Sequence, residues 1–546
     1  MAYTTVHRIA RWLARIAGIF LVSTTAGAYE LLTHQLIAAE AVASSELASV
    51  LQDLGINASM DLFPNSQGQR LSVKGLIQIG ARMEDHGGIR VLNHFFNPLT
   101  NLPLTESVLG MLGSASPDWA LEDNGDVIWR PSLALAILLP FPLDQVRIDQ
   151  VNSYRHAREN FRQALTATAK SDRITQTGLL FQNLGQVIHH LADMAQPEHV
   201  RNDAHLDVSA FPNPLVQALP QALQDPSLYE AYTEHKAATS TVQFRGMLQG
   251  YKPVYPPQPG DTPQFSRPRD FWATAAGQGI GIAEFTNRNF VSNDTNFIQF
   301  NSNTQALPCS ELSEIHSNQN FNKPAASGLT IQQHSPFPTS VDFVQTRIDD
   351  RLRATNETNA QASAVSIFAP ILSGSLFPCV FSINSLTMDA AHQQLLKRAV
   401  GYSAGLINYF FRGKINLAPS QDFGLGWFDI INQGAEALEG TFTLYYDVEG
   451  SEDRQVLATA GPNLRLDPAG QMNSGYPIQV SIPRNFANPG KAILVFEGKI
   501  GSSVQEQVVG KVVNVPEPAT VLLLAAGLAL IGISRRHVHS IIDHLR

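Results

Sequence analysis

Apolar residues in the larger, N-terminal part of the chain recur with the 3.6-residue period of a helix, as in residues 181–194 and 390–411. Gly413 is predicted to end the second of these helices. Closer to the C-terminus the period shortens to alternating runs separated by Gly, Pro and Asn, which predict strands at 441–446, 478–482, 492–496 and 508–513. The pattern therefore predicts a mostly α fold over residues 29–415, followed by a small β-sandwich domain over residues 416–514.

Residues 250–370 interrupt the helical pattern. They contain a Pro-rich piece, residues 252–263, and an Asn/Ser-rich piece, residues 292–304, both of which favour long loops. We therefore expect a loop-rich insertion within the helical domain. The two cysteines, Cys309 and Cys379, lie in or beside it; their spacing does not suit a metal site, and the sequence leaves open whether they form a disulfide.

Residues 1–28 have the order of charge, apolar stretch and small residues that marks a secretory signal peptide. Three arginines precede the apolar residues 16–22, and Ala-Gly-Ala at residues 26–28 follows. Cleavage after this run would make Tyr29 the first mature residue. An N-terminal membrane anchor is the alternative, but the apolar stretch is too short to cross about 30 Å of hydrocarbon.

The other end of the chain, residues 515–546, is predicted to be a sorting signal. It begins with Val-Pro-Glu-Pro, continues with the apolar residues 519–533 and then has Arg535 and Arg536, which place the end of a short transmembrane segment on the cytoplasmic side. This order resembles the PEP-CTERM sorting signal, which implies removal by an exosortase; a plain membrane anchor is the alternative. We expect export to the periplasm, a transient inner-membrane anchor, and then the cell surface or extracellular matrix.

Composition and charge exclude some classes of protein and of binding partner. The 546 residues are 44% hydrophobic and 16% charged, which is ordinary globular composition and excludes a disordered or collagen-like chain. The formal net charge is -9, and because both predicted end signals are basic, the body between them carries about -13. Such an acidic body does not attract a polyanion over a broad face, so no stable nucleic-acid complex is expected.

The candidate chemistry lies in the segment from Leu184 to His205. His189 and Asp193 are four residues apart and share one face of a predicted helix, from which they could bind one ion. Pro197 ends that helix and His199 follows it. A simple hydrogen bond on a helix is the alternative explanation of the first pair. The neighbouring His190 points about 100° away and is expected to be a packed or surface residue rather than a ligand.

The segment His189-x3-Asp193-x5-His199, with Gln-Pro in the turn, resembles the central motif of the zinc-dependent phospholipases C and the fungal single-strand-specific nucleases. Two further segments add to the resemblance: His34 lies five residues after the predicted mature N-terminus, and Asp85 is followed by His94 after eight residues. The resemblance implies a mostly helical, phospholipase C-like domain with two or three zinc ions as cofactor.

Carried over to this chain, the resemblance assigns the ligands of each zinc. One ion is held by Asp85, His94, His189 and Asp193, and a second by the main chain of Tyr29, by His34 and by the other oxygen of Asp193. The third takes His199 and, as our choice of carboxylate, Glu230, with His205 or His235 as the open candidates for an imidazole. The family's His-x3-Glu or His-x3-Asp is missing here, so the sequence leaves the third site open.

The resemblance also implies a reaction. We expect an exported zinc-dependent phosphoesterase that hydrolyses phosphodiester bonds in the manner of a phospholipase C, with Asp85 as the catalytic residue that orients or deprotonates water. Arg201 and Asn202 are candidate contacts to substrate phosphate, although an exposed ion pair of Arg201 with Asp203 explains that arginine equally well. Two alternatives stay open: a single-strand-specific nuclease, and a catalytically silent zinc-containing matrix or binding protein.

Overall fold

The computed structural model describes most of the chain between Glu30 and Val515. The described residues are 30–85, 90–104, 113–122, 128–129, 148–203, 227–258, 265–274, 278–293, 295–299, 315–317, 329–334, 341–353, 359–365, 381–424, 426–483, 486, 491–503 and 505–515. They form two compact units. The first unit takes the described parts of residues 1–46, 74–157 and 181–409, and the second those of residues 47–73, 158–180 and 410–546.

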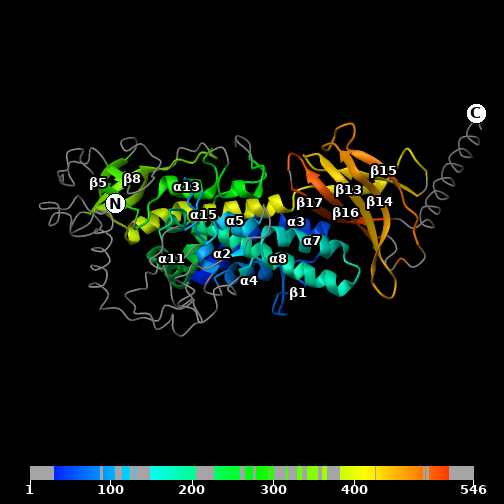
Figure 1. The fold of residues 1–546 in the computed structure, drawn as a ribbon, viewed down its shortest axis with the longest axis horizontal. Helices are drawn as coiled ribbons and strands as arrows, with labels where there is room; N and C mark the ends of the chain where they lie inside the picture. Colours follow the sequence, from blue (N-terminus) through cyan, green and yellow to red (C-terminus); the bar gives the residue numbers. More distant parts are fainter. Residues whose placement is uncertain are drawn as a thin grey trace, which may run out of the picture. The chain divides into compact units, whose positions relative to one another are not determined.

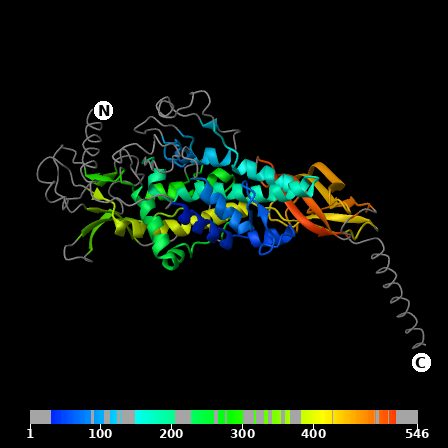
Figure 2. The same cartoon turned by 90° about the horizontal axis from the view of Figure 1, so that it is seen from below.

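The first unit is mostly helical (Figure 1). Its helices stay grouped when the view is turned by 90° (Figure 2), so they form a bundle rather than a single layer. The helices that lie in it, wholly or in part, are α2 (Glu30–Ser44), α4 (Val73–Met83), η1 (Arg90–Asn93), α5 (Ser116–Leu121), α7 (Tyr154–Thr166), α8 (Lys170–Asp193), α9 (Pro197–Val200), α11 (Leu228–Thr239), α12 (Thr241–Met247), η4 (Pro268–Phe271), α13 (Ile282–Asn289) and α15 (Ser385–Phe410).

Helix α8 is buried along its second half. Every residue from 181 to 195 is buried, although polar Gln, Asn, His and Asp side chains lie among the apolar ones. Buried polar side chains are costly unless they are paired or bind a ligand, so this stretch identifies the functional region. The helix ends at Asp193, and Pro197, which needs no N–H partner, opens α9.

The first unit also contains short strands. They are β3 (Ile128–Trp129), β4 (Ile148–Asp149), β5 (Phe297–Gln299), β6 (Ile315–Ser317), β7 (Leu329–His334), β8 (Val341–Arg347), β9 (Asn359–Val365) and β10 (Phe381–Ser382). The last four form one antiparallel sheet in the order β10-β9-β8-β7. The prediction of long loops over residues 250–370 is therefore wrong where β7, β8 and β9 lie. These strands have only a short alternating pattern, and the Asn, Ser and Pro residues beside them favoured a loop prediction.

The second unit contains helix α3 (Leu47–Asp53) and most of the sheet structure. Its strands are β1 (Phe63–Pro64), β2 (Arg70–Leu71), β11 (Ile415–Pro419), β12 (Trp427–Asn432), β13 (Leu438–Asp447), β14 (Arg454–Leu466), β15 (Gly475–Gln479), β16 (Lys491–Ile500) and β17 (Gln507–Asn514). The strand order is β11-β12-β15 in one of its two larger sheets and β14-β13-β16-β17 in the other, and β1 pairs with β2. Sheets therefore replace helices near residue 415, as the change of period predicts.

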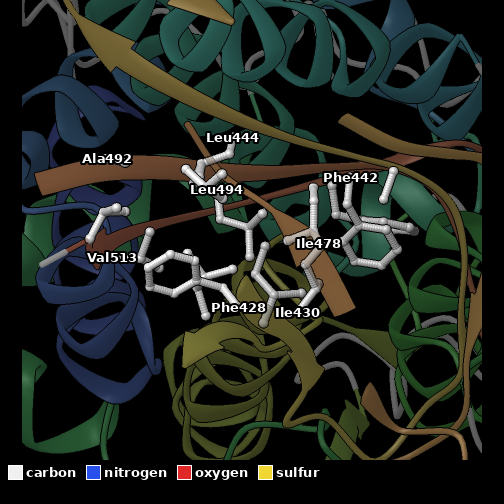
Figure 3. Packing of buried hydrophobic residues seen from close by; sticks show 14 of the residues in the cluster. Phe428, Ile430, Phe442, Leu444, Ile478, Ala492, Leu494 and Val513 are labelled. Atoms are coloured by element: carbon white, nitrogen blue, oxygen red, sulfur yellow. The ribbon is translucent and has the colours of Figure 1, made fainter. Parts of the chain in front are cut away.

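The two larger sheets of this unit bury one shared apolar cluster (Figure 3). Phe428 and Ile430 point inward from β12, and their sequence neighbours on the strand are only partly buried, which is the period-2 alternation of a sheet with one covered face. Phe442 of β13 lies opposite Phe496 of β16, with ring centroids 4.8 Å apart. This pairing of aromatic side chains fixes the register of the central strands.

A buried histidine in α15 makes the stability of the first unit dependent on pH. The Thr233 hydroxyl donates to the Tyr229 carbonyl oxygen (2.6 Å) and so accepts from His392 Nε2 (2.8 Å), which assigns the single ring proton to Nε2. His392 Nδ1 has no hydrogen-bond partner among the described residues. Burial lowers the pKa of His392 to about 4, against the effect of Asp389.

We expect this histidine to weaken the fold in mild acid. Because its folded pKa is below the unfolded value of about 6.5, the unfolded chain binds the proton first, and stability is lost as the pH falls. Between pH 7 and 5 the loss should be about 2 kcal/mol. Denaturant unfolding of wild type and His392→Gln at both pH values measures it; equal pH dependence in the two proteins would contradict the assignment.

Candidate metal centre

Four elements of the first unit bring five of the predicted zinc ligands together. His34 lies in α2, Asp85 follows the end of α4 and His94 follows η1. His189 and Asp193 occupy successive turns of α8, as their spacing predicts. Tyr29 lies outside the described residues, so its main-chain ligation stays a prediction.

Asp193 is the centre of the cluster. Its Oδ1 is 3.3 Å from His34 Nε2, and its Oδ2 is 3.1 Å from His94 Nδ1 and 3.4 Å from His189 Nε2. Asp85 Oδ1 is 3.2 Å from His189 Nε2 and 3.5 Å from His94 Nδ1. The side chains of Asp193 and His189 are no more than 1% exposed. The structure thus gathers five residues that are up to 159 positions apart in the sequence, from His34 to Asp193.

The orientation of His189 suits a metal ligand. Its Nδ1 is 2.7 Å from the Ala81 carbonyl oxygen. Since a carbonyl only accepts, Nδ1 carries a proton and donates it, which leaves Nε2 as the atom that faces Asp85 and Asp193. A backbone carbonyl behind a ligating imidazole is a common arrangement in metal sites, because it fixes the tautomer and the ring plane.

The two carboxylates of the cluster favour positive charge beside them. Burial opposes the charged form of His189, but Asp193 and Asp85 together hold its pKa well above the usual value. Burial likewise opposes the charge of Asp193, but His189, followed by His94, holds its pKa well below the usual range, and the pKa of Asp85 is lowered in the same way. In the chain alone a proton on His189 offsets part of the negative charge of the two carboxylates; a bound metal ion would supply positive charge in its place.

The spacing of the ligand atoms fits zinc. Two ligand atoms about 2.0–2.1 Å from one tetrahedral zinc lie about 3.3–3.4 Å apart, and the observed separations run from 3.1 to 3.5 Å. Two metal-competent groups share His189: one adds His34 and Asp193, the other adds Asp85 and His94. Asp85 Oδ2 and His94 Nε2 are buried without a hydrogen-bond partner among the described residues. These buried and closely spaced imidazoles and carboxylates therefore fit zinc.

The third predicted site is not assembled in the same way. His199 Nε2 is 2.8 Å from Glu230 Oε1, which is a direct hydrogen bond and shorter than the separation of two ligands on one zinc. His199 Nδ1 is 3.2 Å from the His94 carbonyl oxygen and 3.9 Å from Asp193 Oδ2. Of the two candidate imidazoles, His235 is exposed and His205 lies outside the described residues.

Arg201 and Asn202 are held by backbone atoms. Arg201 is 5% exposed and donates to the carbonyl oxygens of Phe290 (2.9 Å) and Asn287 (3.1 Å). Burial lowers its pKa to about 9, against the effect of Asp203. The alternative explanation of a solvent-exposed Arg201 is therefore wrong. Asn202 donates to the Pro103 carbonyl oxygen at 2.7 Å, and a role of either residue in substrate binding stays a prediction.

A second buried group lies beside the cluster and was not found from the sequence. His190 Nε2 is 2.9 Å from Glu84 Oε1, and the His190 and His94 rings meet edge to face with centroids 4.6 Å apart. Arg90 Nη2 is 2.6 Å from Glu84 Oε2. Burial opposes the charge of Glu84, but Arg90 holds its pKa well below the usual range, while burial lowers the pKa of His190 to about 4.

This second group has the composition of a metal site but not its charge. Glu84, His94 and His190 offer three ligand atoms within 4.8 Å of one another. The Arg90 guanidinium already neutralises Glu84, so a divalent ion there would meet a fixed positive charge. His190 is thus a packed, hydrogen-bonded residue that supports His94. The feature of the sequence that could have indicated this group is Glu84, the acidic residue next to Asp85.

Comparison with known proteins identifies the C-terminal signal. Residues 514–536 match the PEP-CTERM protein-sorting motif, which confirms the predicted sorting signal and implies export and processing by an exosortase. No helix in the described ranges is long and apolar enough to cross a membrane. The predicted segment 519–533 and the signal peptide 1–28 lie outside those ranges.

Comparisons over the whole chain are less specific. No curated protein matches the sequence. Among solved structures, alpha toxin from Clostridium absonum is similar at 10% identity and a TM-score of 0.27, with 89% of this chain and 96% of that chain covered. Clostridium perfringens alpha-toxin from an avian strain is similar at 9% identity and a TM-score of 0.23, with 88% and 97% covered. Scores this low assign no fold, so the function must be argued from the site.

Proposed function

We propose that this chain is an exported zinc-dependent phosphoesterase that hydrolyses phosphodiester bonds. The observation that carries the proposal is the convergence of two carboxylates and three imidazoles whose facing atoms are 3.1–3.5 Å apart in a buried site. The ordinary alternative is a polar core in which a protonated His189 pairs with both carboxylates, but that core leaves Asp85 Oδ2 and His94 Nε2 buried without a hydrogen-bond partner among the described residues.

The residues of the chain have separable tasks in this reaction. His34, His94, His189 and Asp193 would hold the metal pair, and bound zinc would supply a low-pKa water and positive charge for the phosphate oxygens. Asp85 Oδ2, which has no hydrogen-bond partner among the described residues, would accept the proton of the attacking water. The water oxygen bonds to phosphorus, the ester P–O bond breaks, and the leaving oxygen takes up the proton that Asp85 accepted.

Phospholipid-type phosphodiesters are the preferred substrate class, and single-stranded nucleic acid is the second candidate. The net charge of -9 favours the first, because a polyanion approaches an acidic protein slowly. A silent matrix or binding protein that keeps a structural zinc pair is the third candidate; the hydrogen-bonded pair of His199 and Glu230 in place of a third metal site favours it.

Metal content and activity together test the proposal. We expect purified mature protein to hold two zinc ions per chain, to hydrolyse a chromogenic phosphodiester, and to lose both activity and thermal stability in a chelator, because metal binding is linked to folding. Hydrolysis of single-stranded DNA alone would select the nuclease. Bound zinc without turnover of either substrate would select the silent protein, and a metal-free chain would reject the site.

A further inference from the structure

Glu234 lies beside the metal centre but makes none of its predicted ligand contacts. It is 2% exposed and lies one turn after Glu230 in α11, on the same face of that helix. Its carboxylate accepts from the backbone N–H groups of Leu32 (2.9 Å) and Thr33 (2.8 Å), and also from the Thr33 hydroxyl. Three donors from the first turn of α2 therefore converge on one side chain.

These contacts complete the start of α2. The first N–H groups of a helix have no partner within the helix, and they carry the positive end of its dipole. A carboxylate satisfies both needs, and here it comes from a residue 202 positions away from Leu32 rather than from the helix itself. Bonds between charged and backbone groups are stronger than neutral ones when buried, so they hold the first turn of α2 against α11.

The next residue after this turn is His34. Its Nε2 is 3.3 Å from Asp193 Oδ1, and its ring stacks on His189 with centroids 3.8 Å apart. The position of His34 thus depends on where the first turn of α2 is held. Glu230 is bonded to His199 instead, so the two carboxylates of α11 have different tasks.

We propose that Glu234 is a positioning residue that docks the start of α2 against α11 and thereby places His34 at the metal centre. The inference rests on the proposed function in one respect only, namely that the centre binds metal. Glu234 is then no metal ligand.

Glu234→Gln tests the proposal, with Glu230→Gln as the matched control on the same face of α11. We expect Glu234→Gln to keep the far-UV circular dichroism of the wild type. Its hydrogen-exchange protection factors at the Leu32 and Thr33 amides should fall at least about tenfold. Its affinity for the metal at the His34 position should fall about 10–100-fold, as for other residues that orient a ligand. Glu230→Gln should leave both amides protected.

Cobalt(II) in place of zinc gives a readout that a purely structural role would not change. We expect the visible spectrum of the Glu234→Gln cobalt protein to show a change in coordination at one of two ions. If the Gln variant does not fold, Thr33→Val, which removes only the hydroxyl bond, should show the same shifts on a smaller scale. Unchanged amide protection, or lost protection with unchanged metal affinity and spectrum, overturns the inference. A wild type that binds no metal rejects the proposed function, while the exchange data still test the docking.

Discussion

Asp193→Asn is expected to remove both the bound metal and the hydrolytic activity, with kcat/KM reduced about 1000-fold or more because a buried charged partner is lost. Both oxygens of the carboxylate are in use: Oδ1 faces His34, and Oδ2 faces His94 and His189. An amide has no negative charge and offers one oxygen, so it cannot bridge two cations. Zinc analysis of the purified variant and turnover of a chromogenic phosphodiester measure the two losses.

Asp172→Asn is the matched control for this variant. Asp172 lies in the same helix, α8, but in its first turn and exposed to solvent. Its loss should cost less than about 1 kcal/mol through the helix dipole and should leave zinc content unchanged. An Asp193→Asn protein with full zinc content would show that Asp193 is an ordinary buried helix residue.

Of the five residues of the centre, only His189 and Asp193 are predicted by a local pattern in the sequence. His189 and Asp193 could be paired from their spacing alone, because four residues in a helix place two side chains on one face. His34, Asp85 and His94 have no spacing relation to that pair. They were predicted from a family resemblance, and the fold then placed all three within ion-pair distance of the pair on α8.

The part that the sequence did not predict depends on contacts between elements. The Ala81 carbonyl behind His189 is a backbone atom, and every residue has one. The carboxylate of Glu234 reaches the start of α2 only because α11 packs beside it. Strands β7 to β9 were missed for a related reason: sheet partners are distant in sequence, and the flanking Asn and Ser residues gave the stronger local signal.

Two glycines allow α4 and α8 to approach closely enough to build the centre. A Cβ on Gly185 would lie 2.2 Å from the Ile77 carbonyl oxygen, and one on Gly80 would lie 2.0 Å from that of Gln182. Real Cβ atoms stay at least 3.0 Å away from such atoms. Since glycine weakens a helix interior by about 1 kcal/mol relative to alanine, a reason in packing is needed, and this contact supplies it.

The contact between α4 and α8 at these two glycines also positions residues of the metal centre. Along α8, Gly185, His189 and Asp193 are four residues apart and share one face. Moving the two helices apart would therefore pull the Ala81 carbonyl away from His189 and would lengthen the contact between Asp85 and His189. The packing of α4 against α8 and the position of His189 therefore depend on the same contact.

Gly185→Ala is accordingly expected to cost the helical unit about 3 kcal/mol, at the upper end for overpacking, because a backbone carbonyl cannot rotate out of the way as a side chain can. It should also weaken zinc binding, although it replaces no ligand. Gly246→Ala in α12 is the control: nothing lies within 4 Å of its added Cβ, so it should be neutral or stabilise the protein slightly. Denaturant unfolding followed by the helical signal, together with a zinc titration, measures both effects. Equal unfolding free energies and equal zinc affinities of the two alanine variants would show that α4 and α8 do not meet at Gly185 and that the metal centre does not depend on this contact.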